Sequence, residues 1–326
     1  MPIESLERLA DDFAALEQPV ERKRMRVIVN PYATTVSERL KSLVVYALQG
    51  RYDVDAIDTE ARDHATALCR EAAQEGYDIV VAFGGDGTVN EAANGLAHSA
   101  TALTCLPGGA SNVYCKVLGV PNDIVDATEH LLRLADDWNP RRVDLAHVNG
   151  RGFTFSGGVG LDASVVRRVD SRPKVKTRFK QWYFGWAAVS TFATEYVVHP
   201  PRLETRVGDE VVRGVTVAVQ NGPAYSYFGD RPICFDRGLA LDDGAIAAAV
   251  LERAAPIDIP TVATRLLAPR MRLSDHRRVS LLRGSGDVHV VATDGRSVPM
   301  QVDGDYIGDV TEAVFGVWPG ALTVIA

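Results

Sequence analysis

Cysteine and long apolar runs are both scarce in this sequence. Four cysteines occur among 326 residues, and no two of them have CxxC or metal-ligand spacing. This argues against a disulfide framework or a zinc site and favours packed thiols in a reducing compartment. The longest apolar stretch, residues 182–193, is too short to cross a bilayer. The N-terminus lacks the basic start and continuous apolar core of a signal peptide, so we expect a cytoplasmic protein.

Positive charge is also in short supply. The chain has 35 Lys and Arg against 42 Asp and Glu, a net charge of −7, and such a balance does not favour nucleic acid. Zinc-finger, basic-zipper and RNA-binding signatures are absent as well, so we expect no nucleic-acid partner. The hydrophobic share of 46% is ordinary for a globular protein, and the length allows two domains.

Residues 1–24 are expected to form an amphipathic helical extension. Its apolar positions recur at three-to-four spacing: Ile3, Leu6, Leu9, Phe13 and Leu16. The opposite face is acidic, whereas helices that lie on membranes favour Lys and Arg there. We therefore expect this helix to pack on its own fold or on a second copy of the chain, which leaves a homodimer open.

The first half of the chain alternates between apolar β-type runs and helical patterns. Strands are predicted at residues 26–30, 52–57, 78–83 and 102–106, and helices at residues 36–48, 63–74, 88–98 and 123–135. Such alternation is typical of a parallel sheet with helices on both faces. Residues 25–141 are thus predicted to form a doubly wound α/β domain.

Short strands replace this alternation after Pro140. They are predicted at residues 143–148, 153–155, 202–207, 211–220, 245–251, 279–282, 288–293 and 298–302, with helices at 179–196 and 257–267. Asn149-Gly150, between the first two of these strands, is a hairpin signal. Residues 142–315 are therefore predicted to form a mostly antiparallel, sandwich-like β domain. Residues 316–326 contain a final apolar strand that could return to either domain.

The most informative motif is Gly-Gly-Asp-Gly-Thr-Val-Asn-Glu at residues 84–91, directly after the apolar strand 78–83. We expect Thr88 to begin a helix, with Glu91 as its capping-box partner. A strand, a glycine loop and a helix N-terminus together favour binding of an anion, usually phosphate. The alternative is a plain turn in which glycine only supplies the backbone conformation. The loops 30–34 and 107–112 are expected at the same edge of the sheet, where ligands of parallel sheets bind.

Five motifs occur in order along the chain. They are Asn30-Pro31, residues 84–91, Pro-Gly-Gly-Ala-Ser-Asn at 107–112, Leu-Asp-Asp-Gly at 241–244, and Val-Asp-Gly-Asp at 302–305. This series resembles the soluble diacylglycerol kinase and sphingosine kinase family of lipid kinases, of the bacterial diacylglycerol kinase type, from Arg26 onward. NAD kinases share the glycine–aspartate motif, but the Val-Asn-Glu continuation and the late Asp-Gly-acid motif favour lipid kinases.

The resemblance implies an ATP-dependent kinase that transfers the γ-phosphate to a hydroxyl of a membrane lipid, diacylglycerol foremost. A NAD kinase-type small-molecule kinase, or a non-catalytic relative that binds nucleotide or lipid, are the alternatives. ATP would lie between the two domains. The residues that the resemblance assigns to ATP are Asn30, Pro31, Tyr32, Ala33, Thr34, Thr59, Gly84, Gly85, Asp86, Gly87, Thr88, Val89, Asn90, Gly109 and Ser111.

Three aspartates are candidates for catalysis by this resemblance. Asp305 matches the last acid of the family's Asp-Gly-Glu motif, and phosphoryl transfer needs a carboxylate within hydrogen-bond reach of the attacking hydroxyl. Because Asp is one methylene shorter than Glu, the backbone must come closer, or Asp303 acts instead. Mg²⁺ between Asp86 and the phosphates would offset their charge. Plain turns are the alternative at each of these positions.

A second magnesium site is implied at the motif 241–244. By resemblance to the bacterial enzymes, Asp243 and the carbonyls of Ala240 and Ala245 would bind a structural Mg²⁺. A hairpin turn is the alternative for this stretch.

Three positions depart from the family pattern. The family usually has threonine at Ala110, often has Asp at Val113, and commonly has Arg at Lys116. Lysine attracts phosphate but lacks the bidentate fork of arginine. These departures bear on the details of nucleotide binding rather than on the backbone cradle.

A basic cluster precedes an aromatic run in the second half of the chain. The basic residues are Arg167, Arg168, Arg172, Lys174, Lys176, Arg178 and Lys180, and the aromatic ones are Trp182, Tyr183, Phe184 and Trp186. Basic side chains attract anionic headgroups, and tryptophan and tyrosine favour the membrane interface. We expect transient docking on an anionic membrane surface, peripheral at the inner face. The alternative is a solvated basic loop before a packed aromatic helix.

Overall fold

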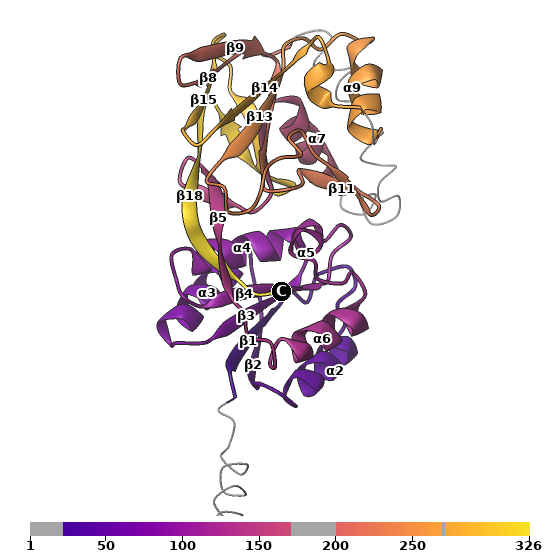
Figure 1. Cartoon of the computed structure of the whole chain (residues 1–326), viewed down its shortest axis with the longest axis vertical. Helices are drawn as coiled ribbons and strands as arrows, with labels where there is room; N and C mark the ends of the chain where they lie inside the picture. The colour runs from indigo at the N-terminus through magenta and orange to yellow at the C-terminus, as the bar shows by residue number, and fades with distance from the viewer. Residues whose placement is uncertain (1–21, 171–199, 269–270) are drawn as a thin grey trace, which may run out of the picture.

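The chain forms two lobes stacked along the long axis of the molecule (Figure 1). The computed structural model describes residues 22–170, 200–268 and 271–326. Residues 1–21 of the N-terminal extension, and the basic–aromatic stretch beyond residue 170, lie outside the described residues. The predictions for both segments therefore stay predictions. Among the described residues, no helix is long and apolar enough to cross a membrane.

A parallel sheet forms the centre of the N-terminal lobe. Its strands are β1 (Arg24–Val29), β2 (Asp53–Asp58), β3 (Ile79–Gly84) and β4 (Ala102–Pro107), in the order β2-β1-β3-β4. Every residue of β3 and β4 is buried, as expected for parallel strands covered on both faces. The chain leaves β1 toward β2 on one side and later returns to β3 on the other. This reversal creates a switch point at the carboxyl ends of β1 and β3, where such folds bind ligands.

Helices cover both faces of this sheet (Figure 1). The helices are α2 (Glu38–Leu48), α3 (His64–Gln74), α4 (Asp86–Leu96), α5 (Val113–Leu118) and α6 (Ile124–Arg133). Packing of α3 on α4 covers one face, and packing of α2 on α6 covers the other. Side-chain caps begin two of these helices, Ser37 at α2 and Asp123 at α6. The predicted doubly wound α/β domain is confirmed.

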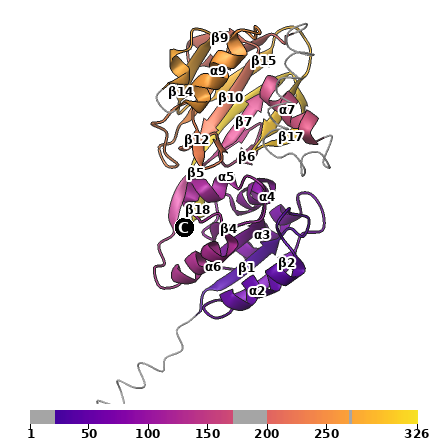
Figure 2. The same ribbon diagram turned by 90° about the vertical axis from the view of Figure 1, so that its right-hand side faces the viewer.

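Two long antiparallel strands join the lobes, β5 (Arg141–Val148) and β18 (Glu312–Val324). Figure 1 shows β18 curving from one lobe into the other, and Figure 2 shows β5 at the junction of the lobes from the side. In the N-terminal lobe, Val324 of β18 pairs with Leu103 of β4 in parallel orientation. In the C-terminal lobe, Phe315 pairs with Val288 of β15. One continuous sheet therefore runs through both lobes.

The C-terminal lobe is a sandwich of two antiparallel layers. Its remaining elements are β6 (Arg151–Phe153), β7 (Ser156–Val159), α7 (Leu161–Asp170), β8 (Leu203–Val207), β9 (Glu210–Gly214), β10 (Thr216–Asn221), β11 (Ser226–Phe228), β12 (Arg231–Ile233), β13 (Ile246–Leu251), α9 (Asp258–Leu267), η2 (Leu273–Asp275), β14 (Val279–Gly284), β15 (Val288–Ala292), β16 (Val298–Val302) and β17 (Asp305–Val310). One layer continues the shared sheet through β15, β8 and β9, and the other has the order β14-β13-β10-β7-β16-β17. Side chains from both layers, such as Val219 and Val290, meet in one core. The predicted β-rich, sandwich-like domain is confirmed.

The single strand predicted at residues 211–220 is wrong. Two strands occupy this stretch, β9 in the shared sheet and β10 in the second sheet. The chain crosses between layers at Gly214, where a Cβ would lie 2.6 Å from Cγ1 of Val250 and 2.7 Å from the carbonyl oxygen of Leu251. The valine-rich stretches on both sides of Arg213-Gly214 have the same β-type composition, so the sequence did not show that they belong to different sheets.

Candidate active site

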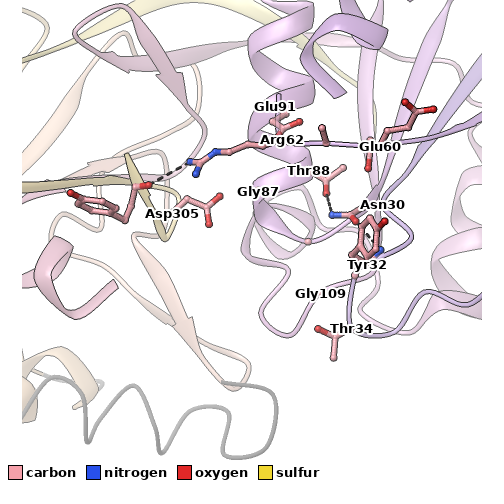
Figure 3. Close-up of a pocket in the computed structure, with 15 residues that line it drawn as sticks. Asn30, Tyr32, Thr34, Glu60, Arg62, Gly87, Thr88, Glu91, Gly109 and Asp305 are labelled. Carbon is pink, nitrogen blue, oxygen red and sulfur yellow. Dashed lines mark hydrogen bonds between the residues drawn. The ribbon is translucent and has the colours of Figure 1, made fainter. Parts of the chain in front are cut away.

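A pocket of about 470 Å³ opens between the lobes, at the carboxyl ends of the parallel strands (Figure 3). Loops after β1, β2, β3 and β4 form its N-terminal side, and the start of β17 forms the other side. The lining residues are Asn30, Tyr32, Ala33, Thr34, Thr59, Glu60, Ala61, Arg62, Gly85, Gly87, Thr88, Glu91, Gly109, Asp305 and Tyr306. The three loops at 30–34, 84–88 and 107–112 thus come together, as their positions after parallel strands predict.

Two glycine pairs make the floor of this pocket. Gly84 pairs with Pro107 across β3 and β4, so the loops that follow lie side by side. A Cβ on Gly108 would lie 2.8 Å from the Cα of Gly84, and one on Gly109 would lie 2.7 Å from the Cα of Gly85. Real side chains are not found at such distances, so both loops require glycine for backbone contact. The result is a surface of bare main chain that a phosphate can approach closely.

Helix α4 begins at this floor, and the predicted capping box is wrong. The helix starts at Asp86 with Gly85 as its N-cap, and no side chain caps it. The hydroxyl of Thr88 is buried and accepts a hydrogen bond of 3.1 Å from Nδ2 of Asn30. Glu91 instead accepts hydrogen bonds from the backbone N–H groups of Asp63 and Ala65, at 2.9 and 3.1 Å, where α3 begins. The carboxylate caps a neighbouring helix, which leaves the N-terminus of α4 facing the pocket.

Asn30 shapes the loop after β1. Its Nδ2 donates to Thr88, and its Oδ1 accepts from the backbone N–H of Tyr32 at 3.0 Å. The ring of Tyr32 is 85% exposed at the rim of the pocket. Thr59 lines the pocket next to this loop, held by its N–H, which donates to the carbonyl of Val29 at 2.8 Å. These contacts fix one wall of the pocket to β1.

Not every residue that the resemblance assigned to ATP reaches the pocket. Those outside its lining are Pro31, Gly84, Asp86, Val89, Asn90 and Ser111. Gly84 and Asn90 lie behind the pocket lining and hold it in place. Gly84 makes the backbone contact with Gly108, and Asn90 donates a hydrogen bond to Asp303 of the C-terminal lobe. Lys116 is also directed elsewhere, because its Nζ donates to the carbonyl of Gly229 at 2.7 Å, in the β11–β12 turn.

Asp86 turns away from the pocket. Its Oδ1 accepts a hydrogen bond of 3.2 Å from the N–H of Tyr114, in the first turn of α5. Burial raises the pKa of this carboxyl to about 7, and the nearby carboxylates of Asp303 and Asp305 act in the same direction against the backbone hydrogen bonds. The carboxylate thus contacts the start of α5 and lies outside the pocket lining, and its role toward Mg²⁺ stays a prediction.

Asp303 is the most heavily hydrogen-bonded carboxylate of this region. Its Oδ2 accepts from Nδ2 of Asn90 and from both the N–H and the hydroxyl of Thr154, at 2.8 to 2.9 Å. Its Oδ1 accepts from the N–H groups of Phe155 and Ser156, both at 3.0 Å. Burial raises the pKa of Asp303, and these donors oppose the rise. With both oxygens engaged, Asp303 ties α4 to the C-terminal lobe.

Asp305 is the carboxylate that the C-terminal lobe presents to the pocket (Figure 3). A Cβ on Gly87 would lie 2.7 Å from Oδ2 of Asp305, so the carboxylate contacts the first turn of α4 across the lobe boundary. Glycine at this position makes the approach sterically feasible.

Sequence reasoning missed Arg62. It lines the pocket from the loop between β2 and α3, and its Nη2 donates to the carbonyl oxygen of Tyr306 at 3.4 Å (Figure 3). A single exposed arginine in a loop carries no pattern. Only its place three residues after Thr59, on a loop at the binding edge, could have drawn attention to it.

Asp243 forms a turn in the C-terminal lobe. Its carboxylate accepts from the N–H groups of Ala240 and Ala245, at 3.1 and 3.2 Å, and forms an ion pair of 2.8 Å with Arg283. Across the described residues, no three His, Cys, Asp or Glu gather in a group that could hold a metal ion. The two backbone contacts are those of a turn, the ion pair with Arg283 adds a partner from β14, and the proposed structural Mg²⁺ at Asp243, Ala240 and Ala245 stays a prediction.

The known proteins most similar in sequence that we report are diacylglycerol kinases. Residues 24–148 match the family model described as the diacylglycerol kinase catalytic domain. A diacylglycerol kinase of Staphylococcus saprophyticus is 25% identical over 88% of this chain and 90% of its own length. One of Bacillus subtilis is 27% identical over 88% of this chain and 91% of its own.

Solved structures share the fold. Two from Bacillus anthracis each cover 94% of this chain and 98% of their own. The first has a TM-score of 0.73 at 24% identity, and the second, a diacylglycerol kinase, has a TM-score of 0.68 at 22% identity.

Proposed function

Because the chain belongs to the soluble diacylglycerol kinase family, phosphotransferases with an alcohol acceptor, we propose that it transfers the γ-phosphate of ATP to a hydroxyl of a membrane lipid. Diacylglycerol is the first candidate substrate. One observation carries the proposal: the carboxylate of Asp305 meets the first turn of α4 at Gly87, within a pocket floored by bare glycine backbone. A proton acceptor and a phosphate cradle thus lie side by side.

The two sides of the pocket have separate tasks in this proposal. Backbone N–H groups of the glycine loops and the positive end of α4 hold phosphate oxygens. Asp305 accepts the proton of the lipid hydroxyl as that oxygen attacks the γ-phosphate. Its neighbour Asp303 holds the β16–β17 turn in place through its hydrogen bonds to Thr154, Phe155 and Ser156. Asp305 is therefore presented by a rigid turn.

The charge of the pocket supports Mg²⁺ as the companion of ATP. The described lining residues include three carboxylates, Glu60, Glu91 and Asp305, and one guanidinium. A polyphosphate would be repelled there unless a divalent cation offset the negative charge. Glu91 is engaged at α3, and Asp86 faces Tyr114. We therefore propose that Glu60 and Asp305 are the carboxylates nearest a nucleotide-borne Mg²⁺, in place of Asp86.

The partners of the chain are part of the same proposal. A kinase whose acceptor is a membrane lipid must reach a bilayer, and the basic–aromatic stretch from Arg167 to Trp186 is the segment with suitable composition. We propose transient docking on an anionic surface at the inner membrane face. A homodimer through residues 1–24 stays a prediction.

Labelling of lipids tests the proposed function. The purified full chain is incubated with Mg²⁺, γ-labelled ATP and a total lipid extract, and the labelled product is identified by mass. Diacylglycerol vesicles and NAD then serve as defined acceptors. We expect label in a lipid phosphate and a loss of about a hundred-fold or more in turnover for Asp305→Asn, the usual contribution of a general base.

The controls of this assay separate the alternatives. Asp305→Asn should still bind ATP, and Asp209→Asn, an exposed aspartate in the β8–β9 turn, should retain full turnover. Label transferred to NAD and not to lipid would contradict the lipid kinase proposal. Unchanged turnover of Asp305→Asn would remove this carboxylate from the mechanism.

A further inference from the structure

Arg62 supplies the positive charge of the pocket. Of the described residues that line it, Arg62 is the one with a cationic side chain. The cation expected from the family pattern is Lys116, whose Nζ instead donates to Gly229 and lies 3.6 Å from Asp230. A triphosphate in this pocket therefore has one protein cation within its walls, and that cation comes from a position outside the family motifs.

The loop that carries Arg62 is fixed at both ends. Before it, the N–H of Thr59 donates to Val29 of β1 at 2.8 Å. After it, the N–H of Asp63 donates to Glu91 of α4 at 2.9 Å. Within the loop, the N–H of Glu60 donates to Nδ1 of His64 at 3.0 Å. Since β1 and α4 also carry the phosphate-binding loops, Arg62 is held in a constant relation to them.

The guanidinium of Arg62 reaches across the pocket to the C-terminal lobe, at the residue that follows Asp305. Within the described residues it makes one hydrogen bond, to the carbonyl of Tyr306, and at 3.4 Å this bond is long. Tyr306 directly follows Asp305. A guanidinium has five N–H donors in a planar fork that suits phosphate oxygens. The bond to Tyr306 uses one of these donors, and Arg62 lines the same pocket as Asp305 and the glycine loops.

We propose that Arg62 binds the terminal phosphate of the nucleotide beside Asp305. The side chain of Lys116 in α5 does not take this role, because its Nζ is bound at the β11–β12 turn. This inference rests on the proposed function, since it assumes a nucleotide in the pocket. Arg62 is then a catalytic residue of this chain that touches both the transferred group and the strand of the proton acceptor. Its bond to Tyr306 also gives phosphate binding a direct link to the position of β17.

The affinities for nucleotides with one, two and three phosphates test this inference. Affinities of the full chain for AMP, ADP and ATP are measured by calorimetry with Mg²⁺, for the wild type, Arg62→Ala, Arg62→Lys and Arg70→Ala. Arg70 is an exposed arginine on α3 and provides the matched loss of charge. We expect Arg62→Ala to lose about ten- to hundred-fold in ATP affinity, the range of one charge-assisted contact, and little in AMP affinity.

The remaining variants show whether the fork itself matters. Arg62→Lys should recover part of the ATP affinity, because it keeps the charge without the bidentate geometry, and Arg70→Ala should match the wild type. Equal losses for AMP and ATP in Arg62→Ala, or no loss at all, would overturn the inference. A wild type that binds none of the three nucleotides would instead overturn the proposed function, so the two failures are distinguishable.

Discussion

Asp86, Asp303 and Asp305 lie near one another, yet their carboxylates have different surroundings. Asp86 begins a helix, Asp303 accepts five hydrogen bonds, and Asp305 lines the pocket. A carboxylate with few donors in a buried place becomes a weaker acid, whereas one with many donors is held as an anion more easily. The same residue type thus takes three roles within one small region.

Asp86 should make stability depend on pH. Its pKa is about 7 in the folded chain against an ordinary value of 3.8, so between these values the folded state binds more protons than the unfolded state. The unfolding free energy of the wild type should therefore fall as pH rises from 4 to 7, and the loss should be complete above 7. Because Asn cannot titrate, the unfolding free energy of Asp86→Asn should not fall in this way. Relative to the wild type it should rise across this range by up to about 4 kcal/mol, at 1.36 kcal/mol per pKa unit.

Urea denaturation at pH 5, 6, 7 and 8 measures this difference. Asp209→Asn, which changes an exposed carboxylate, should follow the wild type at every pH. If the difference between Asp86→Asn and the wild type stayed constant with pH, the raised pKa of Asp86 would be refuted.

At the scale of elements, local signals were predictable and contacts between elements were not. The strand–glycine loop–helix unit follows from the apolar residues 78–83 and from the glycines after them, which let two backbone segments approach closely. The direction of Asp86 depends on the N–H of Tyr114 in α5, which the sequence around residue 86 cannot indicate. Glu91 had the spacing of a capping box but caps α3, because the two helices pack against each other.

Glu91 should therefore stabilise α3 rather than its own helix. Glu91→Ala removes the acceptor of the Asp63 and Ala65 N–H groups, and loss of a cap costs about 0.5–2 kcal/mol. We expect faster hydrogen exchange in the first turn of α3 and an unchanged start of α4, measured by exchange mass spectrometry. Glu71→Ala, at an exposed position in α3, is the matched control. Faster exchange at the start of α4 alone would contradict the assignment.

At the scale of the whole molecule, the pocket exists only because the lobes meet. The N-terminal lobe supplies the loops, and the C-terminal lobe supplies Asp305 and Tyr306. The lobes are joined by β5 and β18, by Asn90 with Asp303, and by Lys116 with Gly229. A sequence shows each of these partners separately, but not that residues more than a hundred positions apart share one wall.

Membrane docking is a prediction for the molecule as a whole. Charge reversal of Lys174, Lys176 and Lys180 to Glu should weaken binding to anionic vesicles by about 1 kcal/mol or more per residue, and should leave neutral vesicles unaffected. Co-sedimentation measures both. Reversal of the exposed Arg39, Arg70 and Arg253 makes the same change of net charge elsewhere. If both triple variants lost vesicle binding equally, a specific docking edge at residues 167–186 would be ruled out.

The strand β18 also constrains the order in which the chain can mature on the ribosome. Residues 24–148, the part that matches the catalytic-domain family, emerge first, but the sheet of that part is completed by Val324 beside Leu103 and by β18 along β5. Until β18 is translated, β4 has an open edge of the kind that attracts other strands and leads to aggregation. The sheet of the nascent N-terminal lobe therefore stays incomplete until β18, which follows most of the C-terminal lobe in the sequence, has been translated.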